Sequence, residues 1–373
     1  MLIVGRMPAR GRPDPASAVS ALRRERTLTT VRRLALDGRR VAAIHRLRPV
    51  ARPGRIRGAI RFASMHGALI ELTHGERPEP VIDRVARAAG AVSRETRIRP
   101  SGDGSALARL TIEGGHRVEL RVAQAGHTKD PARGRAALVA LAEAGVPNVP
   151  RAVAGGITAG AAWSTETVVP GRLVDRLTPG VIDGVLRLCA RFPSAAAAGR
   201  AEAERLEQIA RTFPSERDRL EAVDRAVHRW SSGLGSILVH GDLWRGNILV
   251  QDGAVGGLID WDTWHPSGLP GVDVLGLALA EERAGTGLQL GELFSRDHWR
   301  SPGPTALLSR YFAYRSAPMP DAAGLAAIAV AWWAGHVASS IRRGARPATH
   351  AEWVRRNLHG PLDRIERLLA ELG

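Results

Sequence analysis

Apolar positions along this chain follow two different spacings, which separate a strand-rich part from a helix-rich part. Short apolar runs bounded by glycine and proline predict strands over 41–47, 56–64, 68–73, 106–112, 117–123 and 161–169. Spacings near 3.6 residues predict helices over 81–92, 136–144, 180–192, 199–211 and 215–230, with further helices toward the C-terminus. This order predicts an α+β chain with a small β-rich lobe, a short linker and a larger α-helical lobe.

Turn residues mark where these elements begin and end. Glu113-Gly114-Gly115 lies between two strand patterns and is typical of a hairpin turn. Gly145 and Pro147 are expected to stop the helix at about residue 144, and Pro170-Gly171 to end the strand before them. The chain therefore passes from strands to helices near residue 170.

The composition is that of a globular protein without disulfide bonds. The chain has 373 residues, 44% of them hydrophobic and 24% charged, which is enough to build two packed lobes. Its single cysteine, Cys189, lies in an apolar run, so we expect it in the core of a cytoplasmic protein. The first apolar run is only three residues long, and we expect no secretory signal. The longest apolar stretch, 322–340, is rich in alanine and glycine and predicts a buried helix in preference to a membrane span.

Positive charge is concentrated near the N-terminus. The formal net charge is +16, and residues 1–100 hold 22 arginines against 8 acidic residues. Such a segment is suited to an anionic partner such as a lipid surface, nucleic acid or an acidic protein. The alternative is a solvated, arginine-rich extension or small added domain, since no nucleic-acid-binding motif is present. Residues 201–300 are acidic instead, with 16 acids and 10 arginines.

Three polar residues stand at the edges of short apolar strands within 236–262. The strands 237–239, 248–250 and 257–259 are separated by polar loops, the second of which contains the turn Asp252-Gly253. Asp242 follows the first strand, Asn247 precedes the second, and Asp260 follows the third. Folding is expected to bring the three side chains to one rim.

This set matches the chemistry of phosphoryl transfer. An acid must orient the attacking hydroxyl and accept its proton, and oxygen ligands must hold Mg²⁺ against the nucleotide phosphates. The kinase catalytic loop has the form H-x-D with an Asn five residues after the Asp, and His240-Gly241-Asp242 with Asn247 has that spacing. The alternatives are a simple turn with strand-capping acids, or a metal-hydrolase pair that lacks a second His or Cys group.

The strings HGDLWRGNIL and LIDWD resemble the aminoglycoside phosphotransferase and choline kinase-like family, a branch of the protein-kinase fold. The resemblance runs from about residue 96 to the C-terminus. It implies that Asp242 is the catalytic base and that His240 orients the loop beside it. It also implies that Asn247 and Asp260 bind Mg²⁺ and that Asp273, in LPGVDVLGLAL, braces the loop. His265, in the loop WHPSGLPG, is expected to be a loop or substrate-rim residue.

The same resemblance assigns a nucleotide site to the β-rich lobe. The turn 101–105, ending at Ser105, is expected to cover the phosphates, although a plain hairpin turn explains it equally well. Arg121, in VELRVA, matches the cation that binds the α- and β-phosphates; the alternative is an outward-facing, solvated arginine. At the hinge, the Thr167 carbonyl and the Val169 N–H are the candidate contacts for adenine.

The acid that should pair with this cation is missing from its expected place. Where the kinase fold has a helical glutamate, this chain has Gly134 or Arg135. Asp130 or Glu119 are the candidate substitutes, and without one the chain would be a pseudoenzyme that binds a nucleotide or a partner.

The sequence thus predicts a bilobal protein-kinase-like fold with a basic N-terminal extension (1–95), a nucleotide-binding lobe (96–170) and a helical lobe (171–373). We expect an ATP- or GTP-dependent small-molecule kinase that requires Mg²⁺ and phosphorylates a hydroxyl of a sugar, aminoglycoside-like antibiotic or related metabolite. Protein substrates are disfavoured because 260–273 is too short for an activation segment. Trp244, Trp261 and Trp264 are candidates either for stacking on a sugar ring or for packing.

Overall fold

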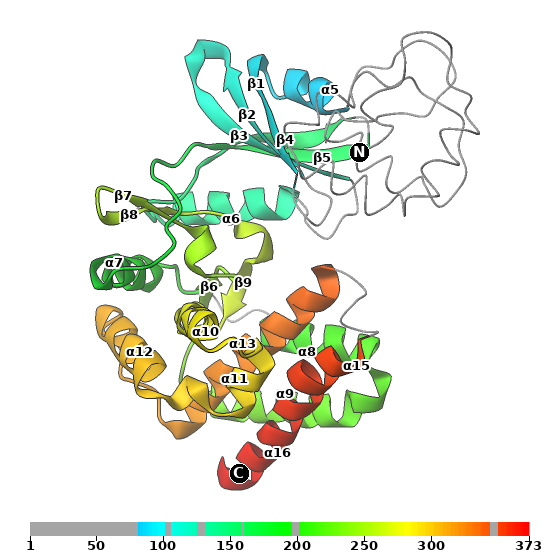
Figure 1. The fold of residues 1–373 in the computed structure, drawn as a ribbon, viewed down its shortest axis with the longest axis vertical. Helices are drawn as coiled ribbons and strands as arrows, with labels where there is room; N and C mark the ends of the chain where they lie inside the picture. Colours follow the sequence, from blue (N-terminus) through cyan, green and yellow to red (C-terminus); the bar gives the residue numbers. More distant parts are fainter. Residues whose placement is uncertain are drawn as a thin grey trace, which may run out of the picture. The chain divides into compact units, whose positions relative to one another are not determined.

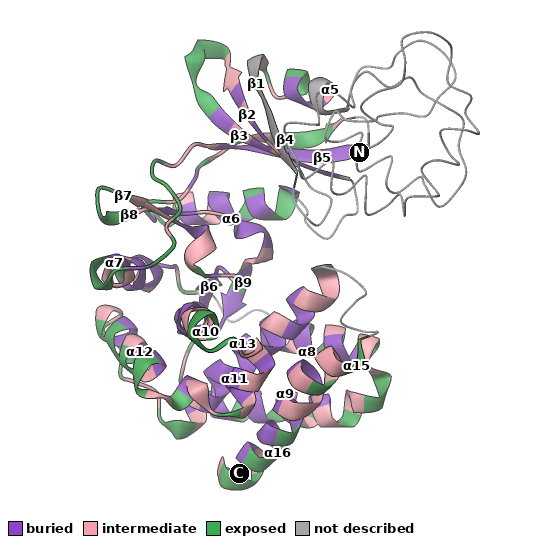
Figure 2. Ribbon diagram, in the orientation of Figure 1, coloured by how far each residue is buried: buried purple, intermediate pink, exposed green. Residues whose placement is uncertain are grey.

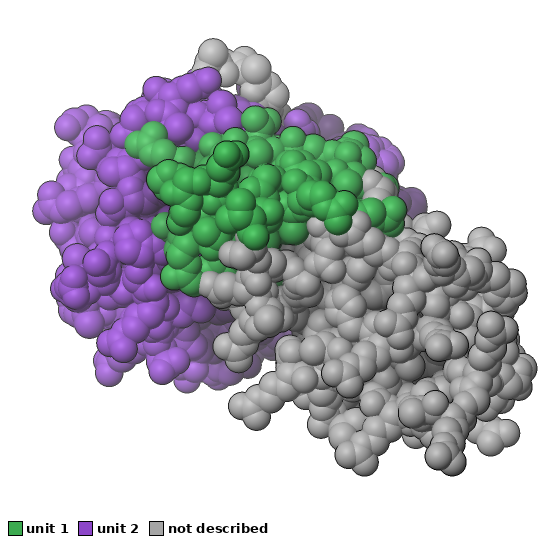
Figure 3. Space-filling view, turned by 90° about the horizontal axis from the view of Figure 1, so that it is seen from above, with its two compact units in different colours: residues 1–135, 151–168 green, residues 136–150, 169–373 purple. Residues whose placement is uncertain are grey.

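The computed structural model describes residues 81–100, 106–124, 131–158, 160–195, 201–343 and 350–372. It divides into two compact units, which are coloured separately in Figure 3. One unit comprises 1–135 with 151–168, and the other 136–150 with 169–373. The strands predicted over 41–47, 56–64 and 68–73 lie outside the described residues.

The first unit is built on an antiparallel sheet of five strands in the order β1-β2-β3-β5-β4 (Figure 1). Its strands are β1 (Ala91–Pro100), β2 (Ala106–Ile112), β3 (Arg117–Gln124), β4 (Ala152–Thr158) and β5 (Ala161–Thr167). The helix α5 (Val81–Ala88) contacts β1, β3, β4 and β5. Figure 2 shows β5 as a buried strand, which agrees with its interior place between β3 and β4.

Side chains alternate between the two faces of β3. Val118, Leu120 and Val122 are buried at 1% exposure or less, so they belong to the core of this unit. Glu119 and Arg121 lie between them in sequence and therefore on the opposite face of the sheet. The hairpin predicted between β2 and β3 is confirmed, and Gly114 and Gly115 both adopt positive φ in its turn.

Two helix boundaries differ most from the sequence prediction. The helix predicted over 81–92 ends at Ala88, because Gly90 turns the chain at φ 74° into β1. The helix α6 (Pro131–Glu143) begins five residues before the predicted start, with proline at its first position, where the missing N–H has no partner to lose.

The strand β4 was not predicted because its centre is Gly155-Gly156, which reads as a loop. In the sheet, a Cβ at Gly155 would lie 3.0 Å from the carbonyl oxygen of Trp163, and one at Gly156 would lie 3.3 Å from the Trp163 ring. These two glycines therefore let β4 lie against the broad side chain of its neighbour β5.

The second unit is mainly helical. Its helices are α7 (Pro179–Ala190), α8 (Ala201–Thr212), α9 (Arg217–Trp230), α10 (Val272–Thr286), α11 (Leu290–Ser295), α12 (Pro302–Tyr314), α13 (Ala322–Arg343), α15 (Ala351–Val354) and α16 (Gly360–Leu372). Two small sheets accompany them, β6 (Ile237–Val239) with β9 (His265–Gly268) and β7 (Ile248–Gln251) with β8 (Ala254–Leu258). The predicted helices and the three strands of 236–261 are thus confirmed, and β9 is an addition.

Helix α13 is the core of the second unit. It contacts α8, α9, α10, α11 and α16. By length and apolar composition it passes the test for a membrane span, but 78% of its apolar window is buried inside the protein. The prediction of a buried helix over 322–340 is therefore confirmed. Cys189, predicted to lie in the core, is 2% exposed, and burial raises the pKa of its thiol.

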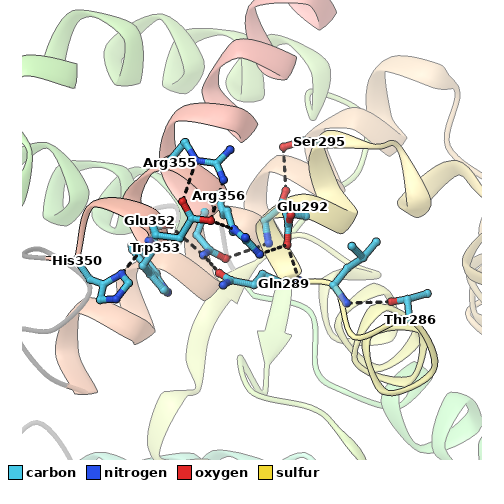
Figure 4. A network of polar contacts seen from close by, with 12 residues as sticks. Thr286, Gln289, Glu292, Ser295, His350, Glu352, Trp353, Arg355 and Arg356 are labelled. Carbon is cyan, nitrogen blue, oxygen red and sulfur yellow. Dashed lines mark hydrogen bonds and ion pairs between the residues drawn. The ribbon is translucent and has the colours of Figure 1, made fainter.

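A buried asparagine joins the C-terminal helices to the core. Asn357, on a π-helical turn between α15 and α16, accepts the N–H of Gly291 at 3.1 Å, and its carbonyl accepts the indole N–H of Trp333 at 2.8 Å. Around it, Glu352 pairs with Arg355 and Arg356, and Gln289 and Glu292 form the capping box of α11 (Figure 4). These contacts fix the end of the chain against α11 and α13.

Candidate active site

In the loop after β6, the backbone N–H and the backbone carbonyl of Asp242 are both hydrogen-bonded. The Asp242 N–H donates to Nδ1 of His240 at 3.3 Å. The Asp242 carbonyl accepts a hydrogen bond from Nδ2 of Asn247 at 2.8 Å. The Asp242 side chain is partly exposed, so a fixed backbone presents a carboxylate that solutes can reach.

His240 is a fully buried part of the loop's framework. Because its Nδ1 accepts a hydrogen bond, its Nε2 carries the hydrogen and donates to the carbonyl of Ile259 at 3.0 Å. Its ring also packs on Trp261, with the ring centroids 4.4 Å apart. Both nitrogens are therefore committed to orienting the loop, and neither is available as a base.

Asp273 holds the same loop from α10. Its two carboxylate oxygens accept the N–H groups of His240 at 2.7 Å and Gly241 at 2.8 Å. Asp273 is 6% exposed, and burial raises the pKa of its carboxyl group, while nearby His240 and the two N–H bonds act in the opposite direction. The loop is thus tied to the helical core by two hydrogen bonds to one side chain.

Ile259 brings Asp260 to this loop. Its N–H donates to the Asn247 carbonyl at 3.0 Å, and its own carbonyl accepts from the His240 ring. Asp260 is the next residue, two positions beyond the end of β8, and adopts the left-handed conformation at φ 69°, so the extended chain does not continue there. The hairpin β7–β8 therefore places Asp260 beside Asn247, although 13 positions of sequence separate them.

Asn247 and Asp260 offer oxygen atoms suited to Mg²⁺. The amide nitrogen of Asn247 is engaged with Asp242, which leaves its Oδ1 as the atom for a cation. Mg²⁺ in phosphate-handling sites commonly takes one or two protein oxygens and fills its other positions with water and phosphate, so this pair fits the ion. Within the described ranges, no group of three or more His, Cys, Asp or Glu residues is arranged to hold a metal.

Two side chains that the sequence offered as candidates for the substrate site, His265 as a loop or rim residue and Trp261 for either stacking or packing, are buried. His265 is in β9, 7% exposed; its Nδ1 accepts the Ser267 N–H at 3.1 Å and its Nε2 lies 3.2 Å from Glu204. Burial lowers its pKa, and the prediction of a loop histidine is wrong. Trp261 is 2% exposed between His240 and Phe192, so it packs and does not stack on a substrate.

The other two tryptophans of this group lie nearer the surface. Trp244 is 44% exposed and Trp264 is half-buried. Trp244 follows Asp242 by two residues, so its indole is the one available beside the loop.

Arg121 pairs with an acid that the sequence did not indicate. Its Nη2 lies 3.2 Å from Glu166 Oε1, and the two side chains are 13% and 10% exposed, so a solvated arginine is excluded. Glu119 pairs with Arg109 instead, and Asp130 lies outside the described residues. In the sheet register Arg121 faces Ser164, which puts Glu166 diagonally across on the same face.

The remaining candidates belong to different parts of the molecule. Thr167 ends β5, where its N–H donates to the Arg151 carbonyl at 2.9 Å. Val169 lies in the second unit and packs closely on Gly257. A Cβ added at Gly257 would lie within 3.0 Å of the Val169 side chain. Ser105 lies outside the described residues.

A β-rich unit, a helical unit and an H-x-D loop braced by a buried aspartate define a kinase-like phosphotransferase class. A model of the family described as "Phosphotransferase enzyme family" matches residues 96–328, more than half of the chain. The chain therefore belongs to this family of small-molecule phosphotransferases. A search of curated protein sequences finds no match.

Solved structures of small-molecule kinases resemble the chain at low sequence identity. Choline kinase LicA from Streptococcus pneumoniae is 12% identical, with a TM-score of 0.50 over 77% of this chain and 97% of that one. A putative fructosamine-3-kinase from Haemophilus somnus is 12% identical, with a TM-score of 0.49 over 75% and 98%. Aminoglycoside phosphotransferase APH(3'')-Id from Streptomyces rimosus is 16% identical, with a TM-score of 0.44 over 67% and 95%. The choline kinase match confirms the protein-kinase-like fold.

Proposed function

We propose that this protein transfers the γ-phosphoryl group of ATP or GTP to a hydroxyl of a small molecule, such as a sugar, an aminoglycoside-like antibiotic or a related metabolite. The observation that carries the proposal is the hydrogen-bonded loop in which Asp242, Asn247 and Asp260 meet. One backbone position, Ile259, connects the loop to Asp260, and one side chain, Asp273, connects it to the helical core.

Each residue has a role that its surroundings permit. Asp242 is partly exposed on a fixed backbone, so it is the group that orients the acceptor hydroxyl and takes its proton. Asn247 and Asp260 would hold Mg²⁺, which neutralises charge on the phosphates when bound. His240 and Asp273 keep the loop in shape and take no part in the proton transfer.

The pair Arg121–Glu166 supports a nucleotide site competent for phosphoryl transfer over the pseudoenzyme alternative. That alternative was motivated by the helix position occupied by Gly134 or Arg135, where a partner acid was expected. Here a strand supplies the acid, and it is mostly buried with the arginine. Because this ion pair already orders the arginine side chain, little further side-chain entropy is lost when the arginine binds phosphates.

Glu166→Gln is expected to raise the Kd for MgATP about tenfold, a loss of about 1.4 kcal/mol in binding. The amide keeps the size of the side chain but removes the charge that orients Arg121. Glu119→Gln is the matched control, since Glu119 pairs with Arg109 on the neighbouring strand. Isothermal titration of both variants with MgATP measures the difference, and equal Kd values for the two would exclude a role for Glu166.

The metal and nucleotide roles are tested by thermal unfolding with ATP and GTP, each with and without Mg²⁺. A ligand that binds only the folded state stabilises it by about 2.7 kcal/mol at a hundredfold excess over Kd. We expect this stabilisation to require Mg²⁺ and to disappear in Asp260→Ala, but not in Asp218→Ala, which changes an exposed acid on α9. If neither nucleotide stabilises the folded wild type, the pseudoenzyme alternative is favoured.

A further inference from the structure

One buried arginine of α8 lies directly against the catalytic loop. Arg205 is 8% exposed. Its Nη2 lies 3.3 Å from the position that a Cβ would occupy at Gly241, the middle residue of the loop motif. A Cβ added there would be in tight van der Waals contact, so the guanidinium lies beside the loop at the residue between His240 and Asp242.

The same guanidinium also lies beside the core helix α13. Its Nη1 lies 3.2 Å and its Cζ 3.4 Å from the Cβ position at Gly335. Since any larger residue at 335 would press on Arg205, this glycine makes room for the guanidinium between α13 and the loop.

The charge of Arg205 acts on the carboxylate that braces the loop. Among the causes that set the pKa of Asp273, burial raises it, and the positive charge of Arg205 lowers it. Other titratable groups that interact with Asp273 include His240, Cys189 and Tyr311. Of these four, Arg205 is the permanent cation. A protonated Asp273 would have one oxygen occupied by hydrogen and could no longer accept both loop N–H groups well.

We propose that Arg205 is a positioning residue: its guanidinium supports the catalytic loop at Gly241 and keeps Asp273 in the carboxylate form that binds the N–H groups of His240 and Gly241. The effect on catalysis rests on the proposed phosphotransferase function. The effect on the loop itself does not, because it follows from contacts within the second unit.

The sequence carried a signal for this residue. Within α8, Glu202, Arg205, Leu206 and Ile209 are all buried and follow the spacing of one helix face. Two charged residues thus stand on a stripe that should be apolar. Glu202 accepts the Leu269 N–H at 3.3 Å, so charged groups of this stripe contact the segments around the loop.

The test compares Arg205→Met with Arg205→Lys, and uses Arg211→Met as control because Arg211 lies on the same helix with a 63% exposed side chain. Amide hydrogen exchange at His240 and Gly241 reports the loop directly. We expect Arg205→Met to lose about tenfold protection at these two amides, because local opening of the loop becomes easier. Arg205→Lys should lose less, and Arg211→Met none. In an Asp273→Asn background, Arg205→Met should add little, since the two act through one contact.

Turnover supplies the second readout, as the pH dependence of ADP release from MgATP. Removing a nearby positive charge raises the pKa of a carboxyl group, so the acid limb of turnover should move to higher pH in Arg205→Met and stay in place in Arg205→Lys.

Unchanged exchange at both amides, or an equal loss of protection throughout the second unit, would overturn the proposal. If Arg205→Met does not fold, Gly335→Ala presses on the guanidinium more gently and should weaken protection at these amides alone; no change there overturns the proposal as well. An absence of turnover in wild type would refute the proposed function and leave the exchange result to decide on Arg205.

Discussion

Asp242→Asn is expected to lower phosphoryl transfer by roughly 10²- to 10⁴-fold, the usual contribution of a positioned general base. The substitution exchanges one oxygen for an NH₂ group, which cannot take a proton from the acceptor hydroxyl. The backbone contacts of residue 242 to His240 and Asn247 remain, so the fold and the loop should persist. The rate of ADP release with saturating MgATP, followed across a panel of hydroxylated acceptors, measures the effect.

Asp252→Asn is the matched control for this experiment. Asp252 is exposed at the tip of the β7–β8 hairpin, at φ 50°, where asparagine is readily accommodated. Its variant should keep wild-type turnover. Nucleotide binding by Asp242→Asn should also remain, since the assigned metal ligands are Asn247 and Asp260. Full turnover in Asp242→Asn would remove Asp242 from the role of base.

Gly241→Ala is expected to destabilise the folded protein and to reduce turnover sharply. Gly241 has φ 77°, and an added Cβ would lie within 3.0 Å of the carbonyl oxygen of Thr263, with Arg205 also in contact. The left-handed backbone alone costs a non-glycine residue about 1–2 kcal/mol. The clash with a backbone atom adds to this, and relieving it requires the loop that carries Asp242 to move.

Gly253→Ala separates these two contributions. Gly253 has φ 78°, almost the same backbone conformation, but nothing lies within 4 Å of its Cβ position. Its variant should lose only the backbone contribution, measured as the change in the free energy of unfolding by denaturant titration, and should keep its turnover. If the two alanine variants are equally stable and equally active, the close packing of the loop on Thr263 contributes to neither stability nor turnover.

The protein-kinase-like framework explains why a small segment carries so much of the proposed chemistry. Hydrogen bonds fix the loop both internally and to other elements: Asn247 bonds to Asp242 within the loop, whereas His240 bonds to Ile259 and Asp273 of α10 bonds to the loop backbone. A carboxylate held by such a network is pre-positioned, and pre-positioning is the main contribution that a protein makes to phosphoryl transfer.

Local features of the chain were enough to predict the strands around the loop and the spacing of its polar residues. A short apolar run bounded by polar residues is readily recognised as a strand. The spacings from His240 to Asp242 and Asn247 are read directly from the sequence. The hairpin at Asp252-Gly253 was predictable for the same reason, because a two-residue turn of this type is set by its own φ angles.

The acid partner of Arg121 was decided only by tertiary structure. Glu166 is 45 residues away in sequence, and it meets Arg121 because β3 and β5 pair in one register. Nothing near either residue specifies that register, since it depends on which faces of the two strands are buried together.

The strands β4 and β9 and the burial of Arg205 have the same origin. Gly155-Gly156 in β4 and the sequence HPSG in β9 have weak intrinsic preference for strands, and their neighbours β5 and β6 impose the extended form. The spacing of α8 puts Arg205 on the buried face of that helix, but what its guanidinium lies against is decided by the packing of α13 and of the loop that carries Asp242. The sequence determined the local turns and the identities of the reactive groups, because these depend on neighbouring residues, whereas the partners of buried charges depend on long-range packing.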